Sequence, residues 1–356
     1  MTRPRSASLR AAIVGCGRIG TCTSPATLAG LPPGWAPLNH AAAARAAGLE
    51  LVAFCDPDAS HLARAGELFG VEALYRDAGE MLAGTAPDIV GLATRTLGRT
   101  DLLRAAVAAG VRGIHVEKPI SRSLADARDA LRAAAAKNVA LTYGTTRRFM
   151  KAYRLARDLV RAGAIGDLIE IDVAHGLASL LWTHPHSTDL LVFFAECREV
   201  DHVQATCRIA GQVRENVLDE DPLVEQATVR FANGILGHIG ASGGMHTTLG
   251  GSRGSLTVAC DGSWLELRKP AGAYLAWPEK VEILPAASGT QTAFAELAEA
   301  VAGREPLISI APGEIELSHA LLFAFVASSL KEGRRIRLQD VDPEFTVTGR
   351  SGDLYA

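Results

Sequence analysis

The stretch that most constrains this chain is residues 9–20, which read LRAAIVGCGRIG. Residues 11–14 are small or β-branched and apolar, as a buried parallel strand requires. A GxGxxG pattern follows, in which Gly15 permits a tight turn, Gly17 lets the backbone approach a pyrophosphate, and Gly20 allows a helix to pack closely on the strand. A strand that runs into such a loop predicts a dinucleotide site, with a helix N-terminus directed at the phosphates.

The helix expected after Gly20 is interrupted, because residues 21–37 contain four prolines and two glycines, which break helices. The sequence predicts an inserted loop here, with the helix resuming near residues 39–47. Two interpretations are open. The insertion is either a surface excursion or a rim or lid near the cofactor, because it emerges at the phosphate loop.

Asp56 directly follows the second predicted strand, residues 51–55. A carboxylate there accepts hydrogen bonds from an adenosine ribose and repels a 2′-phosphate. Its separation from the glycine loop exceeds the usual ~20 residues, and the insertion accounts for the excess. The nearest following cation is Arg64, so the sequence favours NAD over NADP. The alternative is a plain Asp56-Pro57 turn.

Strands and helices alternate up to residue 144, which predicts an α/β fold, a doubly wound parallel sheet of the Rossmann type over residues 1–144. The further expected strands are 89–92, 113–116 and 139–143, and the expected helices are 60–68, 100–109 and 123–136. Such sheets bind ligands at the carboxyl ends of their strands. Those ends carry Gly15, Asp56, Thr94 and Lys118.

Beyond residue 145 the pattern changes to apolar, alternating runs separated by turn signals such as Asn233-Gly234. This predicts a second, α+β domain over residues 145–356 with an open antiparallel sheet. Its expected strands are 168–173, 203–209, 227–231, 235–239, 256–259, 265–267 and 281–284. Helices are expected at 152–162, 292–302 and 314–330.

Composition excludes several classes of partner. The chain has 356 residues, 48% of them hydrophobic, and a formal net charge of −3, which gives no electrostatic basis for binding nucleic acid or a membrane surface. No apolar run is long enough to span a bilayer, and no signal peptide is expected. The six cysteines form no CxxC pair. We therefore expect no metal site, no disulfide and a reducing cytoplasm.

Glu117-Lys118-Pro119 after a later strand adds a further motif to the glycine loop and Asp56. Together with an HxxDLL segment at 186–191, an FxNG hairpin at 231–234 and an SRGSL turn at 252–256, the chain resembles the glucose–fructose oxidoreductase / inositol dehydrogenase family of NAD(P)-dependent oxidoreductases. The resemblance covers about residues 9–340. Arg148-Phe149 and residues 159–169 also resemble the entry to that family's second domain.

The resemblance implies hydride transfer between NAD and a hydroxyl or keto carbon of a small-molecule substrate, namely a sugar, cyclitol or sugar derivative. It also implies that the open sheet joins copies of the chain into a homodimer or homotetramer. The residues expected to bind the cofactor are Gly15, Gly17, Arg18, Ile19, Gly20, Asp56, Thr94 and Glu117.

Hydride transfer at an alcohol carbon needs a matched proton transfer at its oxygen. Lys118 and His186 are the expected catalytic residues, because an ammonium at a strand end can relay a proton and an imidazole titrates near neutral pH. Asp189, three residues after His186, would share its helix face. The residues expected to contact substrate are Arg148, Trp182, His184 and Asp189.

The chain departs from the family pattern in two places. Trp182 stands where an acidic residue or asparagine is usual, and His184 stands where glycine is usual. Trp182 offers a stacking face for a ring and His184 a polar group, so which group replaces the missing acid is open. Arg95 and Arg99 also depart from the pattern, and are interpreted either as an anion site or as solvent-facing loop residues.

Two questions remain open. Arg148 either contacts substrate or forms an ion pair between the domains. The protein as a whole is either a dehydrogenase, an NAD-binding sensor without catalysis, or an enzyme of elimination or glycoside cleavage through transient oxidation.

Overall fold

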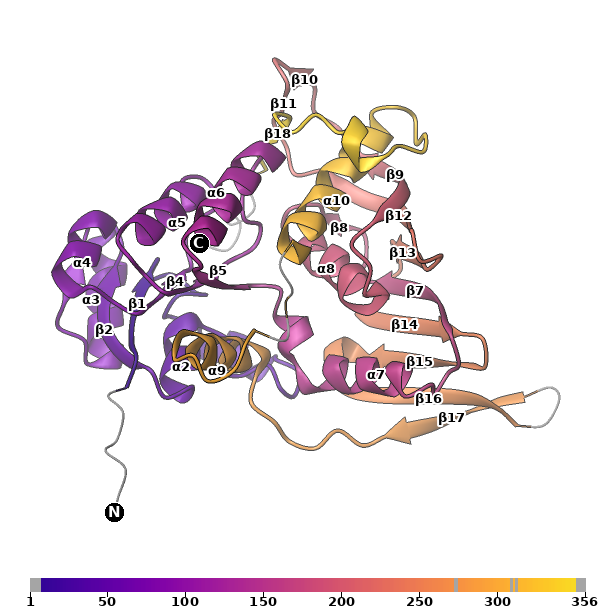
Figure 1. Ribbon diagram of the computed structural model, residues 1–356, viewed down its shortest axis with the longest axis horizontal. Coiled ribbons are helices and arrows are strands. Elements are labelled where there is room, and N and C mark those ends of the chain that lie inside the picture. Colours follow the sequence, from indigo (N-terminus) through magenta and orange to yellow (C-terminus); the bar gives the residue numbers. More distant parts are fainter. Residues whose placement is uncertain (1–7, 272–274, 308–309, 311–312, 350–356) are drawn as a thin grey trace.

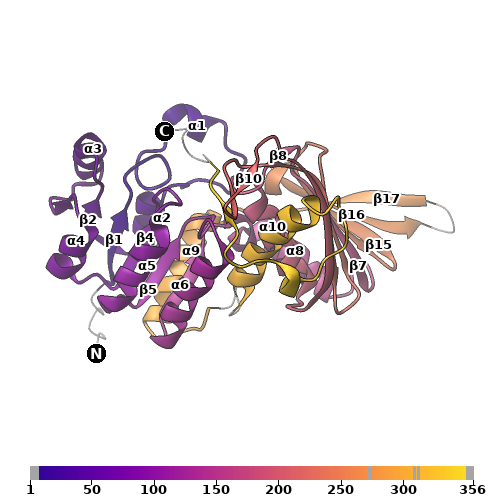
Figure 2. The ribbon, with the colours of Figure 1, turned by 90° about the horizontal axis from the view of Figure 1, so that it is seen from above.

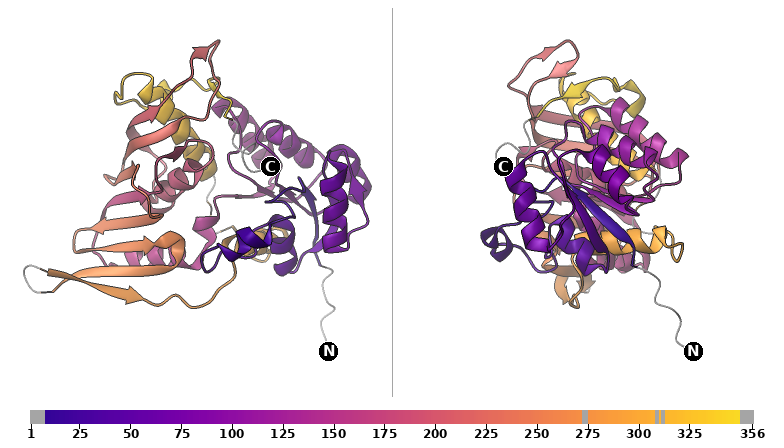
Figure 3. Two further views of the ribbon diagram at one scale, coloured as in Figure 1. Left: turned by 180° about the vertical axis from the view of Figure 1, so that it is seen from behind. Right: turned by 90° about the vertical axis from the view of Figure 1, so that its left-hand side faces the viewer.

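The computed structural model describes residues 8–271, 275–307, 310 and 313–349. It contains two large sheets side by side, one built by the N-terminal part of the chain and one by the C-terminal part (Figures 1 and 3). Among these residues, no helix has the length and apolar character needed to cross a bilayer.

The first sheet has six strands, all parallel, in the order β3-β2-β1-β4-β5-β6. Strand order reverses between β1 and β4, and ligands of open α/β sheets bind at such a switch point. This confirms the doubly wound fold. The strands are β1 (Arg10–Val14), β2 (Glu50–Cys55), β3 (Leu74–Tyr75), β4 (Ile89–Leu92), β5 (Gly113–Val116) and β6 (Ala140–Tyr143).

Alternating residues of β1 face two separate cores. Ala11 and Ile13 pack with α2 (His40–Ala46), α3 (Ala59–Phe69) and α9 (Gly289–Val301), while Ala12 and Val14 pack with α4 (Ala78–Thr85), α5 (Arg99–Ala108) and α6 (Leu124–Ala136). A five-residue helix, α1 (Pro25–Ala29), lies in the insertion.

Helix α9 comes from the C-terminal part of the chain but covers the first sheet, beside α2 (Figure 1). Phe294 and Leu297 of this helix are fully buried in the core under β1. A division after residue 144 therefore separates the two sheets, but it separates α9 from the sheet on which it packs.

The second sheet has nine strands in the order β17-β16-β15-β14-β7-β13-β12-β8, with β9 also paired to β12. It is mixed rather than wholly antiparallel, because β7 and β13 run parallel. Its strands are β7 (Leu168–Ala174), β8 (Ala178–Ser179), β9 (Val200–Arg208), β12 (Leu223–Phe231), β13 (Leu236–Gly240), β14 (His246–Gly251), β15 (Gly254–Ala259), β16 (Trp264–Ala271) and β17 (Leu275–Val281).

Two expectations for this sheet were wrong. The strand expected at 281–284 ends at Val281, and β14, which reads HTTLGG, was not expected because two glycines weaken the strand signal. A small separate sheet joins β10 (Val213–Arg214), β11 (Val217–Leu218) and β18 (Thr346–Val347), and short 3-10 helices cover Thr146–Phe149, Cys260–Gly262 and Leu338–Asp340.

Helices α8 (His184–Ala195) and α10 (Glu314–Ser329) lie between the large sheet and the first domain (Figure 2). Both are apolar over most of their length and are buried on nearly every side, since α10 packs against α8, β9 and α6. Helix α7 (Lys151–Arg161) packs on β15 and β16. The outer face of the sheet is covered by no helix of the described chain.

A buried ion pair joins three segments of the second domain. Arg148 Nη2 lies 2.8 Å from Asp189 Oδ1, with both side chains at 0% exposure, and Arg148 Nη1 lies 2.6 Å from Glu314 Oε2. Arg148 and Asp189 were expected to contact substrate, but the structure directs them at each other inside the domain. The ion pair expected between domains is thus an ion pair within one domain.

We expect Asp189→Asn to lower the free energy of unfolding by about 3 kcal/mol, because it removes one partner of a fully desolvated charge pair. Urea denaturation followed by circular dichroism measures this. The matched control is Asp129→Asn, since Asp129 pairs with Arg132 on the surface, and it should change stability by less than about 0.5 kcal/mol. A similarly small change for Asp189→Asn would contradict the prediction.

Candidate dinucleotide and substrate site

The three glycines of the loop differ in the space around them, as the sequence predicted. Gly15 has φ +93°, and a Cβ there would meet the Ala93 carbonyl oxygen at 2.6 Å. A Cβ on Gly20 would lie 1.7 Å from the Gly15 carbonyl oxygen. A Cβ on Gly17 would meet nothing within 4 Å. The first and third glycines are therefore required by packing, whereas the second borders open space that a phosphate can approach.

The insertion separates the glycine loop from the helix that follows it, α2. The two are joined by hydrogen bonds, because His40 N donates to Ile19 O at 2.8 Å and Ala41 N donates to Gly20 O at 3.0 Å. Asn39 caps the helix through its side chain. Helix α2 thus continues the hydrogen bonding that the loop begins, and the predicted resumption near residue 39 is confirmed.

The insertion also reaches the second domain. Trp35 is 9% exposed, and its Nε1 donates to the Asp261 carbonyl at 3.0 Å. The Arg147 guanidinium lies 5.0 Å from the Trp35 ring centroid and binds both carboxylate oxygens of Asp261, at 2.6 and 2.8 Å. Ser288 donates to the Pro37 carbonyl at 2.7 Å. The C-terminal part of the insertion therefore contacts the second domain, whereas α1 has no buried residue and lies at the surface.

Asp56 ties the second strand to the glycine loop. Its Oδ2 accepts from Cys16 N at 2.6 Å and its Oδ1 from Asp58 N at 2.9 Å, and the residue is 8% exposed. Each carboxylate oxygen can accept a second hydrogen bond, so the group keeps capacity for ribose hydroxyls. At the neighbouring strand end, Thr94 Oγ1 is buried and has no hydrogen-bond partner among the described residues.

Arg99 is a structural residue, and neither of its two interpretations is right. It is 3% exposed and donates to the carbonyls of Thr94, Glu117 and Pro119. Burial lowers its pKa to about 10. Its guanidinium therefore joins the ends of β4 and β5 instead of binding an anion, while Arg95 is exposed.

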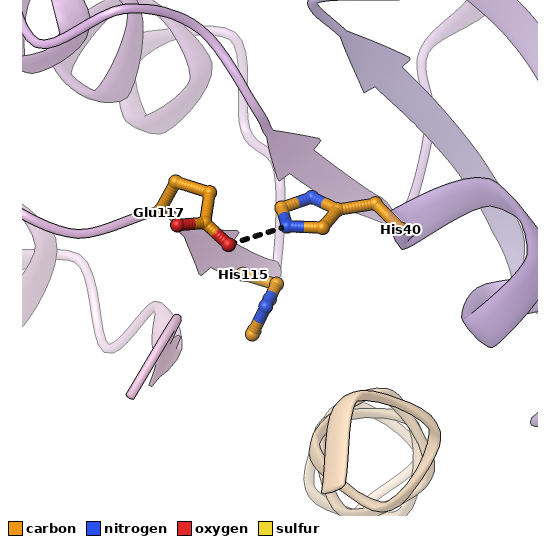
Figure 4. Close-up of side chains that lie close together, drawn as sticks. All are labelled: His40, His115 and Glu117. Atoms are coloured by element: carbon orange, nitrogen blue, oxygen red, sulfur yellow. Dashed lines mark hydrogen bonds and ion pairs between the residues drawn. The ribbon is translucent and has the colours of Figure 1, made fainter. Parts of the chain in front are cut away.

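Glu117 braces the turn that carries Lys118. Its Oε1 lies 3.3 Å from His40 Nε2 (Figure 4). Its Oε2 accepts a hydrogen bond from Lys118 N at 3.0 Å. Burial opposes the charge of Glu117, but the hydrogen bond from His40 and the charges of His40 and Lys118 prevail and lower its pKa to about 2. The carboxylate is thus ionised and occupied by protein donors.

His115 joins the same cluster. Its ring lies 4.6 Å from that of His40, and one ligand atom from each of His40, His115 and Glu117 lies within 4.8 Å of the others (Figure 4). Such imidazole and carboxylate donors suit a transition metal. His115 Nδ1 bonds Thr142 Oγ1 at 2.9 Å and burial lowers its pKa to about 3, whereas His40 Nδ1 is buried without a hydrogen-bond partner among the described residues.

Lys118 reaches from the first domain to the second. Its Nζ donates to the Trp182 carbonyl at 2.8 Å and lies 4.1 Å from the centroid of the Trp182 ring. The guanidinium of Arg18, in the glycine loop, lies 5.8 Å from the same ring. Burial lowers the pKa of Lys118 to about 8, although the charges of Glu117 and Asp221 act to raise it. Trp182 therefore connects the cofactor loop to the expected catalytic lysine.

The environment of His186, the histidine of the HxxDLL segment, disfavours its protonation. Burial lowers the pKa of His186 well below its usual value, and the charges of Arg147 and Lys118 lower it further. His186 Nδ1 is buried and has no hydrogen-bond partner among the described residues. Asp189, expected to share a helix face with His186, is held by Arg148.

His184 lies inside the domain, at 0% exposure. Its Nδ1 lies 3.1 Å from Ser187 Oγ, which in turn lies 3.2 Å from His175 Nδ1. The expected contact of His184 with substrate was therefore wrong, because the buried ring bonds Ser187 of its own helix. The sequence did not single out Ser187, or Asp221, which binds Leu181 from a distant segment.

The fold and this site define a two-domain protein with a Rossmann dinucleotide-binding domain and a polar, cationic junction with a sheet domain. Comparison with known sequences agrees. Residues 9–145 match the family described as an oxidoreductase family with an NAD-binding Rossmann fold. This match confirms the expected resemblance over these residues.

Similar proteins include two D-apiose dehydrogenases. The one from Paraburkholderia graminis is 40% identical over 119 residues, 33% of this chain and 32% of that protein. The one from Rhizobium rhizogenes is 30% identical over 120 residues, 34% of each protein. Each match thus spans about a third of the relative's length.

Solved structures match over nearly the whole chain. A levoglucosan dehydrogenase in complex with NADH and levoglucosan has a TM-score of 0.71 at 17% identity, with 93% of this chain and 100% of that chain covered. An oxidoreductase from Agrobacterium radiobacter, in complex with NAD+, L-tartaric acid and magnesium, has a TM-score of 0.70 at 19% identity, with 94% and 99% covered. At such identities the likeness shows the fold of both domains.

The glycine loop yields a matched pair of variants. We expect Gly17→Ala to fold with nearly unchanged stability, because its Cβ meets nothing within 4 Å, but to bind NADH at least tenfold more weakly. Gly20→Ala should lose about 3 kcal/mol or more of stability, since its Cβ would overlap the Gly15 carbonyl. Thermal unfolding and NADH fluorescence titration check both. Equal effects of the two substitutions on stability would contradict this assignment.

Proposed function

We propose that the protein is an NAD-dependent dehydrogenase or ketoreductase that acts on a CH–OH carbon of a sugar, cyclitol or sugar derivative. The observation that carries this proposal is the position of Lys118. Its ammonium stands at the carboxyl end of β5, at the switch-point edge of the Rossmann sheet, and contacts Trp182 of the second domain. His186 interacts electrostatically with the same lysine.

The cofactor residues follow from the geometry of the loop. Gly17, Arg18 and Ile19 would lie along the pyrophosphate, while Asp56 would accept hydrogen bonds from the adenosine ribose and repel a 2′-phosphate. Thr94 has a buried hydroxyl free to bond a ligand, and Glu117 fixes the turn beside it. These features support NAD over NADP, in agreement with the family of the first domain.

The residues at the junction can supply the proton transfer. NAD, when bound, provides the hydride acceptor. Lys118, with its pKa near 8, can take the proton from a substrate hydroxyl as a neutral amine, or return it to a keto oxygen as an ammonium. Neutral His186 can donate or accept a hydrogen bond at the same oxygen, and Glu117 keeps the lysine backbone in place.

The substrate class rests on Trp182 and on the relatives. The half-buried Trp182 ring presents an aromatic face at the junction, and such faces pack against the C–H surfaces of carbohydrate rings. The names of the relatives, D-apiose dehydrogenase and levoglucosan dehydrogenase, support a carbohydrate substrate for this chain.

The bare face of the large sheet supports self-association into a homodimer or homotetramer. All six cysteines are free, which supports a reducing compartment such as the cytoplasm.

The proposal predicts NADH formation with at least one member of a panel of sugars, sugar lactols and cyclitols. In the oxidative direction the rate should rise as pH passes through about 8, the pKa of Lys118, because the neutral amine is the base. In the reductive direction it should fall over the same interval, because the ammonium is the acid. Stopped-flow absorbance at the NADH band separates the two directions.

Lys118→Met should lower kcat/KM by about 10²-fold or more and abolish this pH dependence. The control is Lys137→Met, because Lys137 is an exposed residue at the end of α6, and it should retain full activity. If the protein binds NAD but turns over no panel member, and Lys118→Met leaves NAD binding unchanged, a cofactor-binding sensor would be supported instead. Tighter binding of NADPH than of NADH would overturn the role of Asp56.

A further inference from the structure

Asp221 binds the same turn as Lys118, although the two residues are far apart in the chain. Its Oδ1 accepts a hydrogen bond from Leu181 N at 2.7 Å, and its carboxylate also interacts with the amide of Trp182. The Lys118 ammonium donates to the carbonyl of Trp182. A carboxylate therefore holds the N–H side of this turn and an ammonium holds its C=O side.

Strand pairing fixes the position of Asp221. Leu180 N donates to the Pro222 carbonyl at 2.8 Å, and the ladder between β8 and β12 begins at the next residues, with Leu223 opposite Ser179. Because Asp221 immediately precedes this ladder, its carboxylate is placed by the sheet and not by a freely moving loop.

The charges around Lys118 explain why a second carboxylate matters. Glu117 and Asp221 favour its ammonium form, while Arg99 and Arg147 oppose it. Glu117 is shared with His40, so it is not devoted to the lysine. Asp221 thus brings to the junction a negative charge from the second domain.

The ionisation of Asp221 depends on the same neighbouring groups. Burial raises its pKa to about 6, although the amides of Leu181 and Trp182 and the charge of Lys118 act to lower it, and neighbouring Glu220 acts to raise it. Above that pH the carboxylate is ionised, and its charge interacts with that of the Lys118 ammonium. The interaction is therefore present over the range in which Lys118 titrates.

We propose that Asp221 is a positioning residue for Lys118: it fixes the turn at residues 181–182 that binds the lysine, and it stabilises the ammonium by its own charge. The second domain thereby sets the protonation of a group carried by the first. If a substrate or cofactor displaced Lys118 from this turn, the carboxylate of Asp221 would remain bound to the turn.

The direct test measures the ionisation of Lys118 without cofactor or substrate. Competitive acetylation with acetic anhydride at a series of pH values, read by mass spectrometry of the peptide that contains Lys118, gives the titration midpoint of its amine. Asp221→Asn should lower this midpoint by about one pH unit, since it removes an opposite charge, while Asp221→Glu should restore most of the shift.

Asp219→Asn is the matched control, because Asp219 lies in the same loop and bonds Thr348 at the surface, and it should leave the midpoint unchanged. An unchanged midpoint in a folded Asp221→Asn protein would overturn the proposal. The reciprocal measurement does not depend on the folding of that variant. In Lys118→Met, the Asp221 carboxyl, followed by ¹³C NMR, should titrate at higher pH than in the natural protein, and the same pH in both would overturn the proposal as well.

The activity readout rests on the proposed function. In Asp221→Asn the rising limb of alcohol oxidation should move to lower pH by the same amount as the labelling midpoint, with the plateau rate affected less than the position of the limb. If no sugar or cyclitol is oxidised, the proposed function fails while the labelling experiment still tests Asp221. If oxidation occurs and the limb does not move, the role of Asp221 fails alone.

Discussion

The hydrogen bond from the Lys118 ammonium to the Trp182 carbonyl is the contact on which the candidate site depends. It joins the turn after β5 to the turn before α8, and so sets one domain against the other at the point where a nicotinamide is expected. A buried ammonium is costly unless nearby groups offset its lost hydration. The aromatic face of Trp182 and the carboxylates of Glu117 and Asp221 provide that compensation.

The rest of the junction is built to keep this contact in place. From the first domain, His40 holds Glu117 and Arg99 gathers the carbonyls at the ends of β4 and β5. From the insertion, Trp35 binds the Asp261 carbonyl and packs against Arg147. These contacts anchor the C-terminal part of the insertion to the second domain through a buried aromatic ring.

The positive charges at the junction also explain its neutral histidines. Arg147 and Lys118 both disfavour protonation of His186, and burial does so more strongly. Buried carboxylate–guanidinium pairs, Arg148 with Asp189 and Arg147 with Asp261, neutralise charge nearby without adding a net charge to the junction. Lys118, with a pKa of about 8, and Asp221, with a pKa of about 6, are therefore the two groups of this junction that ionise on either side of neutral pH.

Local sequence was sufficient for the fold class of the first domain and for the motif positions, but it did not reveal that α9 covers the first sheet. The GxGxxG spacing, the strand before it and Asp56 after β2 identified the parallel sheet and its ligand edge, because turn geometry and strand burial restrict residue type over a few positions. The interruption after Gly20 was also readable, because proline limits helices locally. The mixed order of the second sheet and the strand β14 were not, because pairing partners lie far apart in the chain and glycines weaken the local signal.

By itself the sequence determined which residue types stand at the strand ends, and hence the fold class and the expected lysine and imidazole. Only the tertiary structure decided what each of them contacts. It paired Arg148 with Asp189 inside the second domain, turned His184 toward Ser187, and brought Asp221 to the turn that binds Lys118. The physical reason is that buried charges and polar groups must find partners, and which partner is within reach depends on how distant segments pack and not on their spacing in the chain.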